Sequence, residues 1–207
     1  MKSNLNWMGI HLMFRVREIA PKRSKVSAKS RYQEYRNELR KDFNSACGYC
    51  DGADEFQDKS TFHIDHFAPK SKFPALALDY DNLVYSCRFC NVAKSNKWVM
   101  GDHLTSHDGE RGFIDPCKGD YDEHIYRDIK GMILPKTKLG AYIIQELNLG
   151  LMRHEYLWKA RKLRAQRLKL MELLDKTPKG SNSREKLLEA IVTLMTEYEQ
   201  YFAWACR

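Results

Sequence analysis

The chain has 207 residues, of which 43% are hydrophobic and 30% charged. This composition is typical of a globular protein and excludes collagen, coiled-coil rods and wholesale disorder. The sequence contains no run of 18 apolar residues, and its N-terminus lacks the apolar segment and cleavage site of a signal peptide. We therefore expect a cytoplasmic protein without a membrane partner, in which the six cysteines are reduced and suited to metal binding rather than to disulfides.

The net charge of +8 is unevenly distributed along the chain. It amounts to +7 over residues 1–46, −5 over residues 47–135 and +6 over residues 136–207. Basic flanks suit a polyanion such as nucleic acid, and an acidic centre suits bound cations. Helices with a lysine-rich solvent face would give the same basic flanks, so charge alone leaves nucleic-acid binding open.

The first third of the chain is weakly patterned up to residue 29. The stretch 20–30 is polar and basic, which predicts a mobile arm. A helix is predicted over residues 31–44, with Ser30 and Gln33 at the spacing of a capping box. The apolar residues that recur at helical intervals in this segment are Tyr32, Tyr35, Leu39 and Phe43.

Two strands are predicted in the middle of the chain. Residues 60–67 alternate and are rich enough in β-branched and aromatic residues to form the first, and residues 83–86 form the second. Residues 70–82 connect them, and a helix is expected to begin near Asn91. Residues 112–135 have the composition of short strands and turns.

Three helices are predicted in the C-terminal third, over residues 138–149, 151–176 and 184–205. Asn182 and Glu185 are spaced as an N-cap pair for the last of these. The apolar stripe that is expected to face the core comprises Leu187, Leu188, Ile191, Met195, Tyr198 and Phe202.

The helix predicted over residues 151–176 is strongly basic. Its basic residues are Arg153, Lys159, Arg161, Lys162, Arg164, Arg167 and Lys169. Arg164 and Arg167 fall within or beside the apolar sector, which is unusual for a surface helix. Either their stems snorkel along the core, or they meet an acidic partner or the acidic middle of the chain, or they contact nucleic acid.

Four of the six cysteines form two C-x-x-C pairs. These are Cys47, Cys50, Cys87 and Cys90. Both pairs are expected in turns, and together they supply the tetrahedral thiolate shell of one zinc ion. Four protein ligands leave no open position, so this zinc is structural, and it replaces an apolar core that so short an insert does not supply. Cys117 and Cys206 have no partner at ligand spacing.

The segment between the cysteine pairs carries the residue types that phosphodiester hydrolysis requires. Histidine accepts a proton near neutral pH, and His66 follows Asp65 at the end of the first predicted strand. Hydrolysis also needs a hard cation with oxygen ligands, which Asp65 and Asn91 offer. Asn82 begins the second predicted strand, where it is placed to tie down the loop that carries His66.

These motifs together resemble the HNH endonucleases. The pattern C-G-Y-C … H-I-D-H-F-A-P-K-S … N-L-V-Y-S-C-R-F-C-N-V-A-K-S-N-K-W spans residues 47–98 in the family's order and spacing. The resemblance implies an α+β fold with a zinc-stapled ββα-metal core between mostly α-helical flanks. It divides the chain into a basic N-terminal arm (1–29), a nuclease core with its preceding helix and a cleft segment (30–135), and an α-helical C-terminal domain (136–207).

The resemblance also implies roles for individual residues. Asp65 and Asn91 would bind the catalytic divalent ion, His66 would be the general base, and Asn82 would orient the His66 loop. Asn91 stands where many members have histidine, so the motif reads H-N-N. Members with asparagine there typically use Mg²⁺ or Mn²⁺, which agrees with the oxygen ligands of Asp65 and Asn91.

Three further residues are candidates for nucleic-acid contact. His63 shares a strand face with Asp65, where it contacts a phosphate or packs in the core. Lys94 lies one helical turn after Asn91 and points towards the same phosphate, unless it is a solvated helix residue. Lys70, in the loop after the first strand, is expected to contact the DNA backbone. Three residues of the following segment are interpreted as mostly structural: Asp115, Asp120 and His124.

The first functional hypothesis is a metal-dependent DNA endonuclease, in which water activated by His66 attacks phosphorus and the products carry 5′-phosphate. The alternative is a non-catalytic zinc-binding module that holds nucleic acid or a protein. The helical C-terminal extension resembles that of HNH effectors of bacterial anti-phage systems, which implies a partner ATPase or another defence-system subunit. A restriction or mobile-element nuclease is also compatible with the sequence, and a double-strand cut would favour a homodimer.

Overall fold

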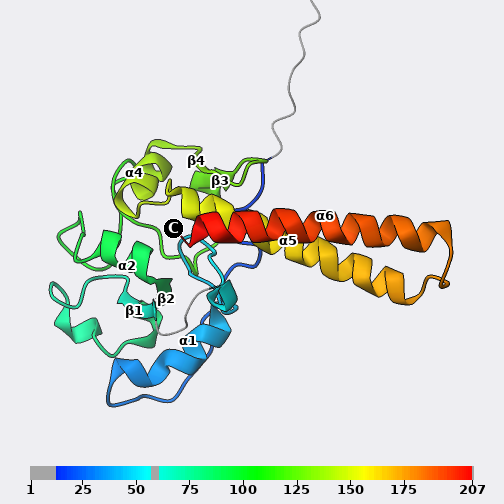
Figure 1. Ribbon diagram of the computed structural model, residues 1–207. Helices are drawn as coiled ribbons and strands as arrows, with labels where there is room; N and C mark the ends of the chain where they lie inside the picture. The colour runs from blue at the N-terminus through cyan, green and yellow to red at the C-terminus, as the bar shows by residue number, and fades with distance from the viewer. Residues whose placement is uncertain (1–12, 57–60, 207) are drawn as a thin grey trace, which may run out of the picture.

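The structure, a computed structural model, describes residues 13–56 and 61–206 (Figure 1). Two small antiparallel sheets of two strands each combine with helices, which confirms the α+β class expected from the sequence. Two long C-terminal helices run side by side and project away from the rest of the chain. No helix in the described part of the chain is both long and apolar enough to cross a bilayer.

The predicted N-terminal helix forms in two pieces. A 3-10 turn covers Tyr32–Tyr35 and is followed directly by α1, Arg36–Asp42. Arg31 precedes the turn without a side-chain cap, so the predicted capping box is wrong. The helix ends before Asn44 and Ser45 because both take up positive φ angles, 55° and 57°. The apolar residues that face the core are the ones the helical spacing predicted, Tyr35, Leu39 and Phe43.

Residues 13–29 are anchored to the core at several points, although many of their side chains are exposed. Val16 is buried, and the guanidinium of Arg23 donates two hydrogen bonds to the carboxylate of Asp115, at 2.8 and 3.1 Å. A buried guanidinium needs such a partner, and this one holds the segment in place. The interpretation of residues 20–30 as a mobile arm is therefore wrong, and residues 1–12 of the expected arm lie outside the described residues.

The middle of the chain forms two strands and a helix. Strand β1 (Phe62–His66) pairs antiparallel with β2 (Leu83–Cys87), with Asp65 opposite Val84, and α2 (Arg88–Lys94) follows β2 without a break. The helix thus begins three residues before the predicted start. Because Cys87 is its N-cap residue, Cys90 lies in the first turn of α2, and the prediction that this C-x-x-C pair occupies a plain turn is wrong.

The β1–β2 connection contains two 3-10 turns, Pro74–Leu76 and Tyr80–Asn82. The segment after α2 buries apolar side chains in the same core, and its elements are α3 (Tyr121–His124), β3 (Ile125–Arg127), β4 (Ile133–Pro135) and α4 (Lys138–Glu146). Phe14 forms a bridge with Arg127, so the N-terminal segment extends the second sheet. Thr137 caps α4, its hydroxyl accepting from the Gly140 amide at 3.0 Å.

The two long helices are α5 (Met152–Asp175) and α6 (Asn182–Ala205). Ser181 caps α6 by accepting from the backbone N–H of Arg184, so the predicted cap at Asn182 is one residue late. The expected core stripe of α6 is only partly buried, since Leu188 is 45% exposed. The far half of the hairpin has only the partner helix to pack against, whereas its near end lies on the core (Figure 1).

The basic residues of α5 meet the acidic middle of the chain. Arg161 donates to the carboxylate of Asp51 at 2.9 Å, and Arg164 pairs with Glu55. Burial raises the pKa of Asp51 to about 6, although the charge of Arg161 acts in the opposite direction. Of the three interpretations offered for Arg164 and Arg167, contact with the acidic middle of the chain applies to Arg164, and Arg161 makes a contact of the same kind.

The buried ion pair between Arg23 and Asp115 gives a stability prediction. Arg23→Met leaves the Asp115 carboxylate buried without its cation, and we expect a loss of about 3–5 kcal/mol in the free energy of unfolding. Urea unfolding measures this loss. The neighbouring exposed Lys22 provides the control, and Lys22→Met should stay within about 0.5 kcal/mol of wild type. Equal losses in both variants would show that the pair does not anchor the segment.

Candidate active site and zinc site

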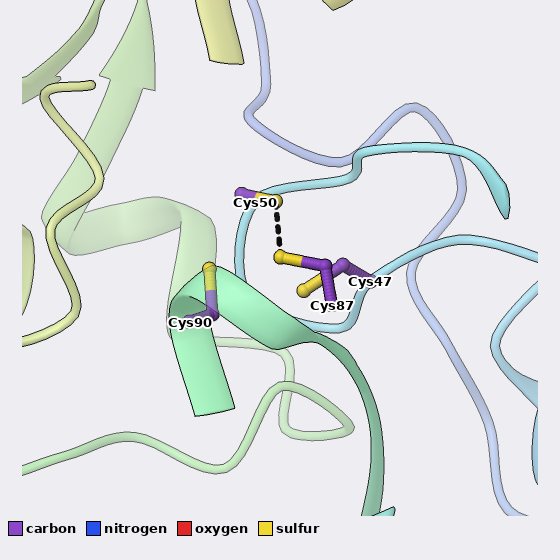
Figure 2. Close-up of side chains that lie close together, drawn as sticks. All are labelled: Cys47, Cys50, Cys87 and Cys90. Atoms are coloured by element: carbon purple, nitrogen blue, oxygen red, sulfur yellow. Dashed lines mark hydrogen bonds between the residues drawn. The ribbon is translucent and has the colours of Figure 1, made fainter. Parts of the chain in front are cut away.

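The four cysteines of the two C-x-x-C pairs converge on one point (Figure 2). All are buried, and their sulfur atoms lie within 4.8 Å of one another. The Sγ atoms of Cys50 and Cys87 are 3.8 Å apart. A tetrahedron with metal–sulfur bonds of 2.3 Å has sulfur–sulfur edges of about 3.8 Å. The cluster therefore fits one structural zinc ion, and Cys117 and Cys206 lie outside it.

A buried arginine lies against this cluster. Arg127 donates to the backbone carbonyls of Cys50 and Gly131, at 2.5 and 2.6 Å. Zinc with four thiolates carries a net charge of −2, and a guanidinium at this place offsets part of it. Burial lowers the pKa of Arg127 and the charge of Cys50 raises it. A cation beside the cysteines is a second feature that suits a thiolate-bound metal.

The cysteine cluster is connected directly to strand β1. Tyr49 lies between Cys47 and Cys50, and its hydroxyl donates to Oδ2 of Asp65 at 2.6 Å. Both side chains are buried, and burial raises the pKa of Tyr49, so the hydroxyl keeps the proton that it donates. The turn that holds two of the zinc ligands thus also fixes the carboxylate of Asp65.

Lys94 also contacts the carboxylate of Asp65. Its ammonium is 3.3 Å from Oδ2 of Asp65 and donates to the backbone carbonyl of His66 at 2.9 Å. Lys94 is 0% exposed, so the prediction that it contacts a phosphate is wrong. Burial raises the pKa of Asp65 and the charge of Lys94 lowers it. The lysine therefore favours the ionised carboxylate and fixes the backbone at His66.

His66 is positioned by the loop that follows it. Its Nε2 lies 3.0 Å from the carbonyl oxygen of Ala77. A carbonyl oxygen only accepts, so Nε2 carries the proton and Nδ1 is left as a proton acceptor. Burial lowers the pKa of His66, which favours the neutral imidazole. The ring of Tyr32 packs against the imidazole edge to face, with 4.7 Å between centroids.

Asn82 closes this loop. Its amide oxygen accepts from the backbone N–H of Ala68 at 2.8 Å, and its amide nitrogen donates to the carbonyls of Ala68 and Leu76 at 3.0 and 3.3 Å. Asn82 is buried and lies behind the loop. These contacts are the ones needed to orient the segment that carries His66, and they agree with the positioning role that the sequence suggested.

Asn91 and His63 lie side by side. The amide nitrogen of Asn91 donates to Nδ1 of His63 at 2.9 Å, which leaves the amide oxygen of Asn91 available. The Oδ1 atom of Asp65 accepts no hydrogen bond from residues 13–56 or 61–206. Two oxygen donors of the kind that Mg²⁺ and Mn²⁺ prefer are thus available from Asp65 and Asn91.

A cleft of about 310 Å³ brings most of the predicted site residues together. Those that line it are Asp65, His66, Asn91 and Lys70. His63 lies just beyond, in an adjoining hollow, Asn82 lies behind the loop, and Lys94 lies beneath the floor. Sequence reasoning did not assign a role to Tyr49 or Tyr32. The only signal for Tyr49 was its place between two cysteine ligands, and Tyr32 showed none beyond its helical spacing.

Comparison with known proteins shows what the segment around this site is similar to. The HNH endonuclease family matches residues 47–97. The Septu protein PtuB of Bacillus mycoides (strain KBAB4) is 27% identical over 122 residues, covering 49% of this chain and 41% of that protein. The Septu protein PtuA of the same strain is 25% identical over 137 residues, covering 54% of this chain and 18% of that protein. The match thus spans less than half the length of either relative. No solved structure matches the chain.

The cysteine cluster predicts one zinc ion per chain. Cys90→Ser removes a ligand, and we expect it to lose zinc and the cooperative thermal transition, because structural zinc contributes about as much free energy as a whole domain's net stability. Atomic absorption and circular dichroism measure the two effects. Cys206→Ser, at an exposed cysteine outside the cluster, should keep both. Zinc-free wild-type protein that melts cooperatively would contradict the assignment.

Proposed function

Residues 47–97 form an HNH endonuclease domain, and we propose that the protein hydrolyses DNA phosphodiester bonds with His66 as the general base. The observation that carries this proposal is the cleft itself. Asp65, His66 and Asn91 line one hollow, and the imidazole presents a neutral nitrogen as proton acceptor. A scaffold protein has no chemical need for such a base beside two oxygen donors.

In this mechanism His66 accepts a proton at Nδ1 from the water molecule that attacks phosphorus. The bond from phosphorus to the 3′ oxygen breaks, and the products carry 5′-phosphate. Ala77 and Asn82 hold the imidazole in place during the transfer, because the histidine and its loop are fixed by their hydrogen bonds. Lys70, exposed at the rim of the cleft, would contact the DNA backbone.

Asp65 and Asn91 would hold one Mg²⁺ or Mn²⁺ ion in this cleft. When bound, such an ion neutralises charge on the phosphate and on the leaving oxygen. Asp65 would offer Oδ1, since Oδ2 is engaged by Tyr49 and Lys94. Asn91 would offer its amide oxygen, since its amide nitrogen is engaged by His63.

We further propose that the protein acts in the cytoplasm as the nuclease of a bacterial defence system with several subunits. Both curated relatives are Septu proteins, and Septu is an anti-phage system. The resemblance of the C-terminal extension to anti-phage HNH effectors suggests that one of these subunits is an ATPase that controls the nuclease. The projecting hairpin of α5 and α6 offers a surface for such a subunit, or for a second copy of the chain if both DNA strands are cut.

The central test is plasmid cleavage with Mg²⁺ or Mn²⁺. We expect wild type to nick or linearise supercoiled DNA, EDTA to stop the reaction, and His66→Ala to lower the rate at least about 100-fold, because a positioned base contributes about 10²–10⁴-fold. His103→Ala changes an exposed histidine outside the cleft and should cleave like wild type. Zinc-loaded wild type that remains inactive with its partner subunits present would favour the non-catalytic binding module.

The pH dependence of cleavage follows from the burial of His66. Burial lowers the pKa of this imidazole below its usual 6.5, so the active, neutral form persists to more acidic pH than for a free histidine. We expect the rate to be constant from about pH 7 to 8 and to fall only as the pH drops through a value below about 6.5. Single-turnover rates across this range provide the measurement. A rate that is still rising above pH 7 would exclude His66 as a base in this environment.

A further inference from the structure

A second hollow of about 370 Å³ adjoins the catalytic cleft. The two share Tyr32, Ile64 and Asn91, so they form one groove that follows strand β1 from its His66 end to its Phe62 end. The residues that line the second hollow are Tyr32, Gln33, Arg36, Phe62, His63, Ile64 and Asn91.

The second hollow has the charge expected of a site for a polyanion. Among residues 13–56 and 61–206, none that lines it is acidic, and Arg36 contributes a guanidinium. That guanidinium is held at the wall, because it donates to the backbone carbonyl of Phe62 at 2.8 Å. In the adjoining catalytic cleft, the ammonium of Lys70 lies 4.5 Å from the centre of the Tyr32 ring. Each of the two hollows thus has a basic residue among those that line it.

Tyr32 is the residue that joins the two hollows. Its ring lies against the imidazole of His66, its hydroxyl is 3.4 Å from the ammonium of Lys70, and it is partly exposed. Tyr32, Gln33 and Arg36 all precede the residues that match the HNH family. The segment before the nuclease domain therefore supplies one wall of the groove.

We propose that the second hollow binds the nucleotide that adjoins the scissile phosphate of the DNA strand. Arg36 and Gln33 contact its backbone phosphate, and Tyr32 packs against its sugar or base. Guanidinium groups and polar side chains are the usual partners of phosphate oxygens, and aromatic rings the usual partners of bases. This inference rests on the proposed nuclease function. It adds a subsite that the segment 32–36 builds outside the nuclease domain.

Binding measurements in the His66→Ala background test the subsite without cleavage. The probe is fluorescein-labelled duplex DNA with Mg²⁺, followed by anisotropy. Gln33 is exposed, so Gln33→Glu should fold normally while its negative charge repels the phosphate, and we expect affinity to fall about tenfold. Gln166→Glu makes the same change at an exposed position of α5 away from the groove and should leave affinity unchanged.

Arg36→Gln provides a second variant with a separate signature. Loss of one phosphate contact should lower the slope of log affinity against log salt concentration by about 1. Unchanged affinity and slope in both variants, with His66-dependent cleavage in the parent, would overturn the subsite and leave the nuclease function intact. Weakened binding in both, with no cleavage by wild type, would support the subsite and remove the nuclease function. If Gln166→Glu lowered DNA affinity as much as Gln33→Glu, the loss would be an effect of net charge alone, and the subsite would be overturned.

Discussion

The convergence of four buried thiol groups is the constraint on which the rest of the site depends. Cys50 and Cys87 are 37 residues apart in sequence, yet their sulfur atoms lie 3.8 Å apart. Meeting at one point fixes the end of β2, the first turn of α2 and the turn before β1 relative to one another. Tyr49 belongs to that last turn, and its hydroxyl reaches Asp65. The position of the carboxylate in the cleft is therefore a consequence of how the cysteines are held, so zinc binding at the cysteines would shape the proposed metal site at Asp65.

The buried charges of Lys94 and Asp65, beneath the cleft, contribute more to the positions of the site residues than to the stability of the fold. Taking Lys94 and Asp65 out of water costs free energy that their attraction only roughly offsets. The pair fixes the positions of the groups around it. Lys94 also donates to the backbone carbonyl of His66, so one ammonium holds two neighbouring residues of β1 in place. Asn82 does the same for the loop beyond them. The proposed base and the proposed metal ligand are thus both held from behind, by groups that substrate does not reach.

The sequence predicted the parts of the site that depend on local spacing. The cysteine pairs and both strands could be found because ligand spacing and strand periodicity are local properties. The roles of Asp65, His66, Asn82 and Asn91 came from the family resemblance and remain predictions, although the fold does bring the four residues to the cleft or its loop. Lys94 was misplaced because helical periodicity puts it near Asn91 without saying which side of α2 is covered. The contact of Arg23 with Asp115 joins residues 92 apart, and Tyr32 reaches His66 from another element. Such contacts arise from packing, which no single-chain pattern encodes.

The core that supports the cleft is assembled from both sides of the segment that matches the HNH family. Leu39 precedes that segment and Phe113 and Leu139 follow it, yet all three are buried in one cluster with the four clustered cysteines. Residues 47–97 therefore match a known family as one segment, but they do not form a separate folding unit. Transplanted alone into another protein, they would bring the cysteines and the proposed base without the apolar surroundings that hold them. Exchange of such domains between proteins must carry the flanking segments as well, or find equivalents in the new host.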